Sequence, residues 1–498
     1  MTGPFPSCTI LNFPNCALPD PTPGTSDEFC TVNSTLPSAE LCAAACLASA
    51  SCTSYTWHAD DPVNGPWALA CVFRLDGAWE PEYDAAAHAC GEKVEPAPPL
   101  VWPVSDGFNK LPVMWFGSNV SGLDAHDTLA LIARHRVGVY GWQQGTGALV
   151  PGQNLGEGDV FLAEAATHLS DYLDEVGAAG LNRTLVGVYR QVQVALRLFA
   201  APRAAADNSA NADFWMRDND GVICAVAQPW GTTDPFWNFS NVAAFNYWVD
   251  QVVSDVAAEA PAGVRTVFFD ESDQNFCGYW SEPQGNCGSF SLTSLAPMHA
   301  ANNALLARTA ATLNAAGIIP IFSMLNRMAA SGAGLNIADP CALPEDVTLA
   351  ALNNTVAARF YENFPFSWWA PGVSGPDGAA ALVENAILEG IAGLPLVLHF
   401  DVTSCPSTPR NITRPGRMGG GVEVELALFL VVQTEQTVFS ISGNWYDADF
   451  CWRSEFDIEF GHPLAPAYRM GPYAWTRNFT KSWVAVDVQA GTGEVWLL

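Results

Sequence analysis

Basic residues are scarce in this chain of 498 residues, which carries 21 Lys and Arg against 51 Asp and Glu. The resulting formal charge of −30 repels phosphate backbones and anionic lipid faces, which argues against nucleic acid as a partner. Long apolar runs are also missing, because the longest, 426–432 and 394–400, fall well short of the roughly 18–20 residues that cross a bilayer. The sequence therefore predicts no membrane-spanning helix.

Several sequence motifs are absent as well. No G-x-G-x-x-G or G-x-x-x-x-G-K-S/T segment follows an apolar run, so the usual signs of a nucleotide site are missing. The chain also has no G-x-S-x-G elbow, no H-E-x-x-H helix and no repeated Asp calcium loops, which argues against serine hydrolase, zincin and EF-hand chemistry. The 8 histidines are scattered. We predict no metal and no other cofactor.

Cysteine, by contrast, is abundant. Eight of the 14 cysteines lie near the N-terminus, at Cys8, Cys16, Cys30, Cys42, Cys46, Cys52, Cys71 and Cys90. This dense pattern predicts a disulfide framework. It is accompanied by seven Asn-x-Ser/Thr sequons, at Asn33, Asn119, Asn182, Asn238, Asn353, Asn411 and Asn478.

Both features indicate a secreted, extracellular glycoprotein. Residues 1–20 lack the basic start and the apolar stretch of a signal peptide, so we expect the export signal to have been removed from this chain. The alternative is a cytosolic protein with metal-binding cysteines. The spacings Cys42-x3-Cys46 and Cys46-x5-Cys52 disfavour it, because zinc sites prefer C-x2-C pairs.

The cysteine density falls after a proline-rich stretch near residue 100. Segment 95–103 reads E-P-A-P-P-L-V-W-P, which cannot continue a helix or a central strand. We therefore predict an N-terminal extension (1–29), a disulfide-rich module (30–92), a linker (93–107), a large domain (108–460) and a C-terminal β segment (461–498).

The small module has a recognisable arrangement. Helix-forming residues at 39–49 place Cys42 and Cys46 one turn apart, and 51–57 alternates like a strand. This Cys-x3-Cys-x5-Cys-x2-Tyr-x-Trp segment, closing with Cys71-Val-Phe, resembles the PAN/Apple fold over residues 30–92. The resemblance implies adhesion to protein or carbohydrate, and it implies the disulfide pairs Cys46–Cys52, Cys42–Cys71 and Cys30–Cys90, leaving Cys8 with Cys16. The alternative is a generic cystine-rich module without a binding role.

The large domain alternates strand-like and helix-like segments. Eight short apolar runs lie at 112–117, 137–142, 185–189, 265–270, 318–323, 356–362, 394–401 and 437–442. Segments of helical period lie between them at 124–135, 159–176, 242–258, 300–315, 378–389 and 422–432. Because eight βα units close a barrel, we predict an α/β fold of the (β/α)8 TIM-barrel type, with an open doubly wound sheet as the alternative. Runs at 482–488 and 493–497 predict a terminal β appendage.

Three of the eight runs end in acids, at 268–271, 360–362 and 399–401. Active sites of such barrels lie at the carboxyl ends of the strands. Cleavage of a glycosidic bond needs one carboxylic acid to protonate the leaving oxygen and a second carboxylate to attack or to activate water. The alternative is that each acid only caps the helix after its strand.

The approach to the fourth run carries a family resemblance. The segments F-W-M-R-D-N-D-G (214–221), D-P-F-W-N-F-S (234–240) and G-V-R-T-V-F-F-D-E (263–271) follow one another, and Y-A-W-T-R-N-F (473–479) precedes V-A-V-D (484–487). Over residues 108–498 this order resembles TIM barrels of the glycoside hydrolase type. Where family barrels often continue with Asn-Pro, this chain has Asn238-Phe-Ser.

We assign roles to the acids as follows. Asp270, pointing into the barrel mouth, is the predicted nucleophile or base, and Glu271 then lies on the loop or toward the helices because alternate residues share a face. Glu362 is the predicted proton donor, with Phe360 and Tyr361 as the apolar wall that raises the pKa of its carboxyl. Asp401 orients sugar hydroxyls or serves as the alternative partner.

Sugars are bound by aromatic platforms and planar hydrogen-bonding groups. The predicted substrate-binding residues are Trp115, Trp142, Gln143, Asp218, Trp280, Asn326, His399 and Trp445. Trp142, Trp280 and Trp445 are the preferred platforms, whereas His399 is either a substrate ligand or a buried core group.

Two functions remain open at this stage. The first is a secreted glycoside hydrolase whose N-terminal module attaches it to a polysaccharide, cell surface or matrix. The second is a non-catalytic glycan-binding or extracellular-matrix protein that uses the same barrel mouth. Both predict carbohydrate as the partner.

Overall fold

The computed structural model divides the chain into two compact units, 1–99 and 100–498. In the first unit it describes only the backbone of 30–35, 54–58, 70–74 and 88–92. In the second it describes 102, 108, 110–119, 123–145, 155–179, 183–228, 230–259, 263–272, 292–323, 355–365, 375–401, 416–418, 422–442 and 452–498, with 292–300, 401, 416 and 442 as backbone alone.

The first unit contains an antiparallel sheet in the order β1-β3-β2-β4. Its strands are β1 (Cys30–Thr35), β2 (Ser54–His58), β3 (Ala70–Arg74) and β4 (His88–Glu92). Residues 54–57 of the strand predicted at 51–57 lie in β2, and residues 51–53 lie outside the described residues. The helix expected at 39–49 and the disulfide pairs lie outside the described residues, so the PAN/Apple likeness stays a prediction.

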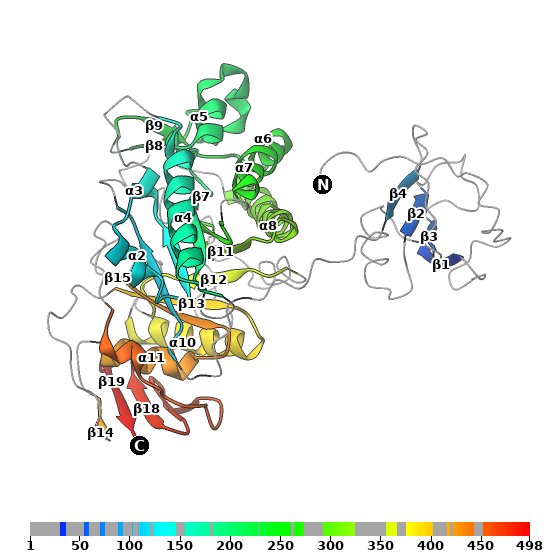
Figure 1. Cartoon of the computed structure of the whole chain (residues 1–498). Coiled ribbons are helices and arrows are strands. Elements are labelled where there is room, and N and C mark those ends of the chain that lie inside the picture. Colours follow the sequence, from blue (N-terminus) through cyan, green and yellow to red (C-terminus); the bar gives the residue numbers. More distant parts are fainter. Residues whose placement is uncertain are drawn as a thin grey trace. The chain divides into compact units, whose positions relative to one another are not determined.

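The second unit is built on a closed barrel of eight strands, each pairing in parallel with its two neighbours (Figure 1). In chain order these are β5 (Val113–Gly117), β6 (Val137–Tyr140), β7 (Leu185–Gln191), β10 (Thr266–Asp270), β11 (Ile319–Ser323), β12 (Ala358–Tyr361), β13 (Leu396–Asp401) and β15 (Thr437–Ser442). All eight predicted runs form strands, which confirms the (β/α)8 barrel and excludes the open sheet.

The inside of the barrel is filled by side chains. The ring of Phe268 on β10 lies 4.9 Å from Phe116 on β5 and 4.9 Å from Phe360 on β12, in edge-on contacts between strands that are not neighbours. Close packing between β7 and β10 requires a glycine at position 187, because an added Cβ would lie 2.5 Å from the Thr266 side chain. Residues two apart in a strand share a face, so these contacts show which side chains point inward.

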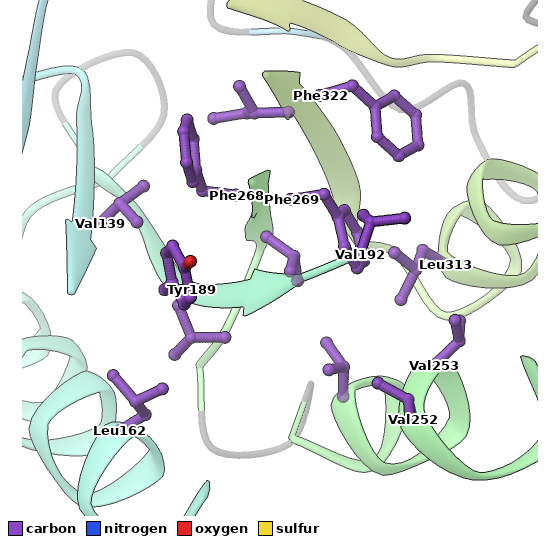
Figure 2. Packing of buried hydrophobic residues seen from close by; sticks show 14 of the residues in the cluster. Val139, Leu162, Tyr189, Val192, Val252, Val253, Phe268, Phe269, Leu313 and Phe322 are labelled. Atoms are coloured by element: carbon purple, nitrogen blue, oxygen red, sulfur yellow. The ribbon is translucent and has the colours of Figure 1, made fainter. Parts of the chain in front are cut away.

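Helices cover the outside of the barrel (Figure 1). They are α2 (His126–Ile132), α3 (Trp142–Gly145), α4 (Gly158–Glu175), α6 (Val242–Tyr247) continued by η4 (Trp248–Val253) and α7 (Ser254–Ala258), α8 (Leu292–Ala315), α10 (Gly375–Ile391) and α11 (Glu423–Val432). Figure 2 shows apolar side chains of α4, η4 and α8 gathered around strands β7, β10 and β11. No helix in the described part of the chain is long and apolar enough to cross a membrane.

A long excursion, residues 192–263, separates β7 from β10. It contains α5 (Ala200–Asp207), η3 (Ser209–Phe214), β8 (Ala225–Ala227) and β9 (Thr233–Pro235), none of which the sequence predicted, followed by the helices α6, η4 and α7. Backbone bridges Val194–Phe236 and Trp215–Trp237 hold the excursion together. Trp237 is only 1% exposed, so much of the tryptophan here serves packing.

The chain ends in a five-stranded antiparallel sheet in the order β14-β19-β18-β17-β16. Its strands are β14 (Gly416–Arg417), β16 (Tyr468–Gly471), β17 (Ala474–Asn478), β18 (Ser482–Asp487) and β19 (Thr492–Leu497). The predicted terminal strands are confirmed in β18 and β19. The sheet packs on α11 so closely that a Cβ on Gly493 would lie 2.8 Å from the Val424 Cα.

Arg477 on β17 joins this sheet to the barrel. Its Nη1 donates to the carbonyls of Gln433 at 2.6 Å, Leu430 at 3.1 Å and Val431 at 3.3 Å, at the C-terminal end of α11. Burial lowers the pKa of its guanidinium to about 10. We expect Arg477→Leu to lower the free energy of unfolding by about 2–3 kcal/mol, because it removes charged hydrogen bonds and leaves buried carbonyls unsatisfied.

Urea unfolding followed by tryptophan fluorescence measures this loss. The matched control is Arg469→Leu, since Arg469 lies on the adjacent strand β16 but its side chain is 42% exposed. The control should change stability little. Equal losses in both variants would contradict the role of Arg477.

Candidate active site

Asp270 is the last residue of β10 and points into the barrel. Phe268, two residues earlier, contacts Phe116 and Phe360 across the interior, and alternate residues of a strand share a face. The Asp270 side chain is half-buried, above this layer of rings. The predicted orientation of Asp270 therefore agrees with the structure.

Two donors hold the carboxylate of Asp270. The hydroxyl of Tyr189 on β7 donates to Oδ2 at 2.8 Å, and the backbone N–H of Glu271 donates to Oδ1 at 2.9 Å. Burial raises the pKa of Asp270 above its ordinary value, while both hydrogen bonds act in the opposite direction because they stabilise the charged form. Each oxygen thus has a fixed partner.

Glu271 lies in the turn directly after β10. Its φ of 50° is in the left-handed region, which is unusual for a residue with a side chain. Ser272 fixes the turn, because its N–H donates to the Ser323 carbonyl at 3.1 Å and its carbonyl accepts from Asn302 Nδ2 at 2.8 Å. The Gln191 amide donates to Glu271 Oε2 at 2.9 Å, so this carboxylate lies beside the end of β7.

Glu362 follows β12 in a second tight turn, where Asn363 has a φ of 53°. His399 of β13 anchors this turn: its carbonyl accepts from the Phe364 N–H at 2.8 Å, and its Nδ1 accepts from the Asn363 N–H at 3.4 Å. The half-buried Glu362 side chain therefore starts from a backbone that the neighbouring strand holds in place.

The predicted apolar wall beside Glu362 is half wrong. Phe360 faces the barrel interior, as expected. Tyr361 faces the opposite way, and its hydroxyl donates to Glu389 Oε2 of α10 at 2.6 Å. Neighbouring residues of a strand point to opposite faces, so the two rings cannot flank one carboxyl group.

The acids nevertheless share one end of the barrel, which we call the rim. Strands β10 and β12 are parallel and separated only by β11, so Asp270, the last residue of β10, and Glu362, directly after β12, both lie at the carboxyl ends of their strands. Asp401 ends β13, the next strand around the barrel. Its side chain lies outside the described residues.

His399 is buried beneath the rim rather than presented on it. The imidazole is 1% exposed and stacks on Phe360 at a centroid distance of 5.4 Å. Burial lowers its pKa to about 3, so the ring is neutral at physiological pH. Of the two predicted alternatives, this placement favours a core group over a substrate ligand.

The predicted aromatic platforms have different placements. Trp115 is 5% exposed and packs edge-on against Tyr140, 5.1 Å between centroids, on the helix side of the barrel wall. The structure therefore places Trp115 away from the rim, because its neighbour Phe116 occupies the inward position. Trp142 begins α3 at the end of β6, is half-buried and lies 5.6 Å from Trp230.

The predicted polar ligands are engaged within the protein. Gln143 is 5% exposed, and its Oε1 accepts from the Ser118 hydroxyl at 3.3 Å. Asp218 holds its own turn, since its Oδ1 accepts from the N–H groups of Asp220 at 3.0 Å and Val222 at 2.9 Å. Trp280, Asn326 and Trp445 lie outside the described residues and stay predictions.

Two residues of the site were missed from the sequence, Tyr189 and Gln191. Both lie on β7, where they are the direct neighbours of Phe268 and Asp270 on β10. The sequence did carry a sign of these two residues, because polar side chains alternate along the later part of the run that begins at residue 185. Only the register between the strands shows which acids they meet. Among the described residues no group of three or more His, Cys, Asp or Glu side chains could hold a metal ion.

Comparison with known proteins gives a partial family match. Residues 421–483 match the model of a family described as hypothetical glycosyl hydrolase family 15. The match spans α11, β15, β16 and β17, at the junction of the barrel and the terminal sheet. No curated protein matches the chain significantly.

Several solved structures are similar at low identity. A quadruple mutant of α-N-acetylgalactosaminidase from Bifidobacterium bifidum is 14% identical, with a TM-score of 0.40 over 78% of this chain and 57% of its own. An α-galactosidase from Thermus thermophilus is 14% identical, with a TM-score of 0.38 over 85% and 76%. The catalytic domain of a β-amylase from Paenibacillus polymyxa is 8% identical, with a TM-score of 0.39 over 67% and 92%. The chain thus spans 57% of the first of these proteins.

Proposed function

We propose that this chain is a glycoside hydrolase that uses Asp270 and Glu362 as its acid and base pair. The observation that carries the proposal is that carboxyl groups lie at the carboxyl ends of parallel strands β10 and β12, at one rim of a closed barrel. The partial match to a glycosyl hydrolase family model supports the same reaction class.

The proposed reaction assigns one role to each acid. Glu362 gives its proton to the glycosidic oxygen as the bond to the anomeric carbon breaks. Asp270, as a carboxylate, takes one of two roles. It either attacks that carbon, in which case a water deprotonated by Glu362 then breaks the bond between the sugar and Asp270, or it takes a proton from the water that attacks the carbon directly. The hydrogen bonds from Tyr189 and from the Glu271 N–H leave Asp270 oriented in either case.

We further propose that the substrate is an extracellular poly- or oligosaccharide. The cysteines and sequons of the N-terminal region support secretion, and Cys224 in the barrel unit is disulfide-bonded, in agreement with an oxidising compartment. The N-terminal module would keep the enzyme on a polysaccharide, a cell surface or a matrix. Trp142, half-buried at the end of β6, is the described aromatic residue best placed to contact a sugar.

The test is a panel of algal, plant and bacterial polysaccharides assayed for new reducing ends, with the parent chain and Glu362→Gln. We expect the variant to lose about 10²–10⁴-fold in rate on the natural substrate, because it cannot protonate the leaving oxygen. On an aryl glycoside whose leaving group departs without protonation, the loss should be much smaller. This difference separates a proton donor from a residue needed only for folding.

Glu459→Gln is the matched control, because Glu459 is 54% exposed and pairs with Lys481 on the surface. It should leave both rates unchanged. Retained polysaccharide binding with no new reducing ends on any substrate would contradict the hydrolase. That outcome would favour the non-catalytic glycan-binding protein instead.

A further inference from the structure

Strand β7 contributes two side chains to the rim, and they meet the last residue of β10 and the acid that directly follows it. Tyr189 donates to Asp270 and Gln191 donates to Glu271. The register explains this, because Tyr189 is paired with Phe268 and Gln191 with Asp270 in the β7–β10 ladder. Tyr189 thus bonds to the residue two positions beyond its own partner, and Gln191 bonds to the residue directly after its own partner.

Tyr189 is held rigidly. Its side chain is 3% exposed, and its ring stacks on Phe268 at 6.1 Å and on Phe199 at 6.5 Å between centroids. A buried ring in contact with two other rings keeps its hydroxyl in one place, so the 2.8 Å bond to Asp270 Oδ2 is pre-formed. The second oxygen is bound by the Glu271 N–H, which the left-handed turn presents.

We propose that Tyr189 is a positioning residue for Asp270, whose hydrogen bond fixes the rotation of this carboxylate at the rim and favours its charged form. The inference rests on the proposed function for its effect on rate. The geometry on which it stands is independent of that function, because both hydrogen bonds and the ring stacking exist in the folded chain itself.

The other groups around Asp270 do not replace this hydroxyl. On its own turn lies the Glu271 carboxyl, which disfavours a second negative charge nearby. β11 contributes Ser323, a neutral hydroxyl, as its last residue, and β12 is followed by Glu362 at the same rim. On β7 the residue paired with Asp270 is Gln191, whose side chain is a neutral amide. Tyr189 is thus a side-chain donor that favours the charged form of Asp270.

The test compares Tyr189→Phe with Tyr140→Phe. Tyr140 is a matched control because its hydroxyl also donates to a carboxylate, Asp124 Oδ2 at 2.9 Å, from a ring that is 1% exposed on the helix side of the barrel. We expect Tyr189→Phe to lower kcat/KM by about 10- to 100-fold, the effect of losing a hydrogen bond to a charged group.

The pH profile supplies the decisive readout. The Tyr189 bond favours the ionised form, so its removal should raise the pKa of Asp270 and move the acidic limb of kcat/KM to higher pH. Tyr140→Phe should lower thermal stability about as much as Tyr189→Phe does, but it should leave the pH of the acidic limb unchanged. An acidic limb that does not move in Tyr189→Phe, or one that moves equally in both variants, overturns the proposal.

A second measurement separates this proposal from the proposed function. Titration of the Asp270 carboxyl by NMR, in chains carrying ¹³C-labelled Asp, reports its pKa without any substrate. If the parent chain cleaves no glycoside, the hydrolase proposal fails, yet a higher Asp270 pKa in Tyr189→Phe still supports the positioning role. An unchanged Asp270 pKa in Tyr189→Phe overturns that role, whatever the activity of the parent chain.

Discussion

Asp270→Asn is expected to reduce kcat by about 10³-fold or more while the barrel stays folded. The reason is that an amide can neither attack the anomeric carbon nor deprotonate the water that does so, and no neighbouring group replaces that function. In the variant the amide oxygen can accept from the Glu271 N–H and the amide nitrogen can donate to the Tyr189 hydroxyl, which rotates to accept, so the local geometry should survive. Steady-state kinetics on the best substrate of the polysaccharide panel measures the effect.

The control for this variant is Asp457→Asn. Asp457 is 53% exposed and pairs with Arg134 on the surface, so the same chemical change there should leave kcat unaltered. Equilibrium binding of the same polysaccharide should persist in Asp270→Asn. A variant that keeps more than about a tenth of the parental kcat would contradict direct participation of Asp270 in the reaction.

Glu389→Leu is expected to cost about 3–5 kcal/mol of unfolding free energy, the usual effect of removing one partner of a buried ion pair. Glu389 of α10 is 3% exposed and is bonded both to Arg359, itself 6% exposed, and to the Tyr361 hydroxyl. Both partners lie on β12, directly before Glu362. Urea unfolding measures the loss, and turnover should also fall because the strand that carries Glu362 is loosened.

Two further variants make this prediction specific. Glu384→Leu, on the same helix but 52% exposed, should change stability little. The double variant Arg359→Met/Glu389→Leu should recover part of the stability lost in Glu389→Leu, because it removes the buried guanidinium along with its carboxylate. A double variant less stable than Glu389→Leu would contradict the ion-pair explanation.

The barrel could be predicted because its strands are buried on both faces. Such strands are short continuous apolar runs, and all eight appeared in the sequence at nearly their final bounds. The same property hides which way each side chain points. In the run V-M-W-F-G of β5, Trp115 and Phe116 are equally apolar, and only the structure shows that Phe116 faces the interior.

The contacts around the acids could be predicted only in part. That Asp270 and Glu362 end strands followed from the pattern alone, whereas the donors that hold Asp270 depend on the register between β7 and β10. Tyr361 was misassigned because its partner, Glu389, is 28 residues away on α10. The excursion at 192–263 has short elements without clear periodicity, so its strands β8 and β9 left no readable signal.

Helix α11 has no face suited to water, since every residue from Leu426 to Val432 is buried. One side packs on the barrel, and the other is covered by Val484 and Val495 of the terminal sheet. A shortened chain that stopped at residue 460 would expose that second side as a continuous apolar surface and would tend to aggregate. Recombinant production of the barrel therefore requires the polypeptide through Leu498, and the sheet cannot be exchanged freely between proteins as an independent accessory.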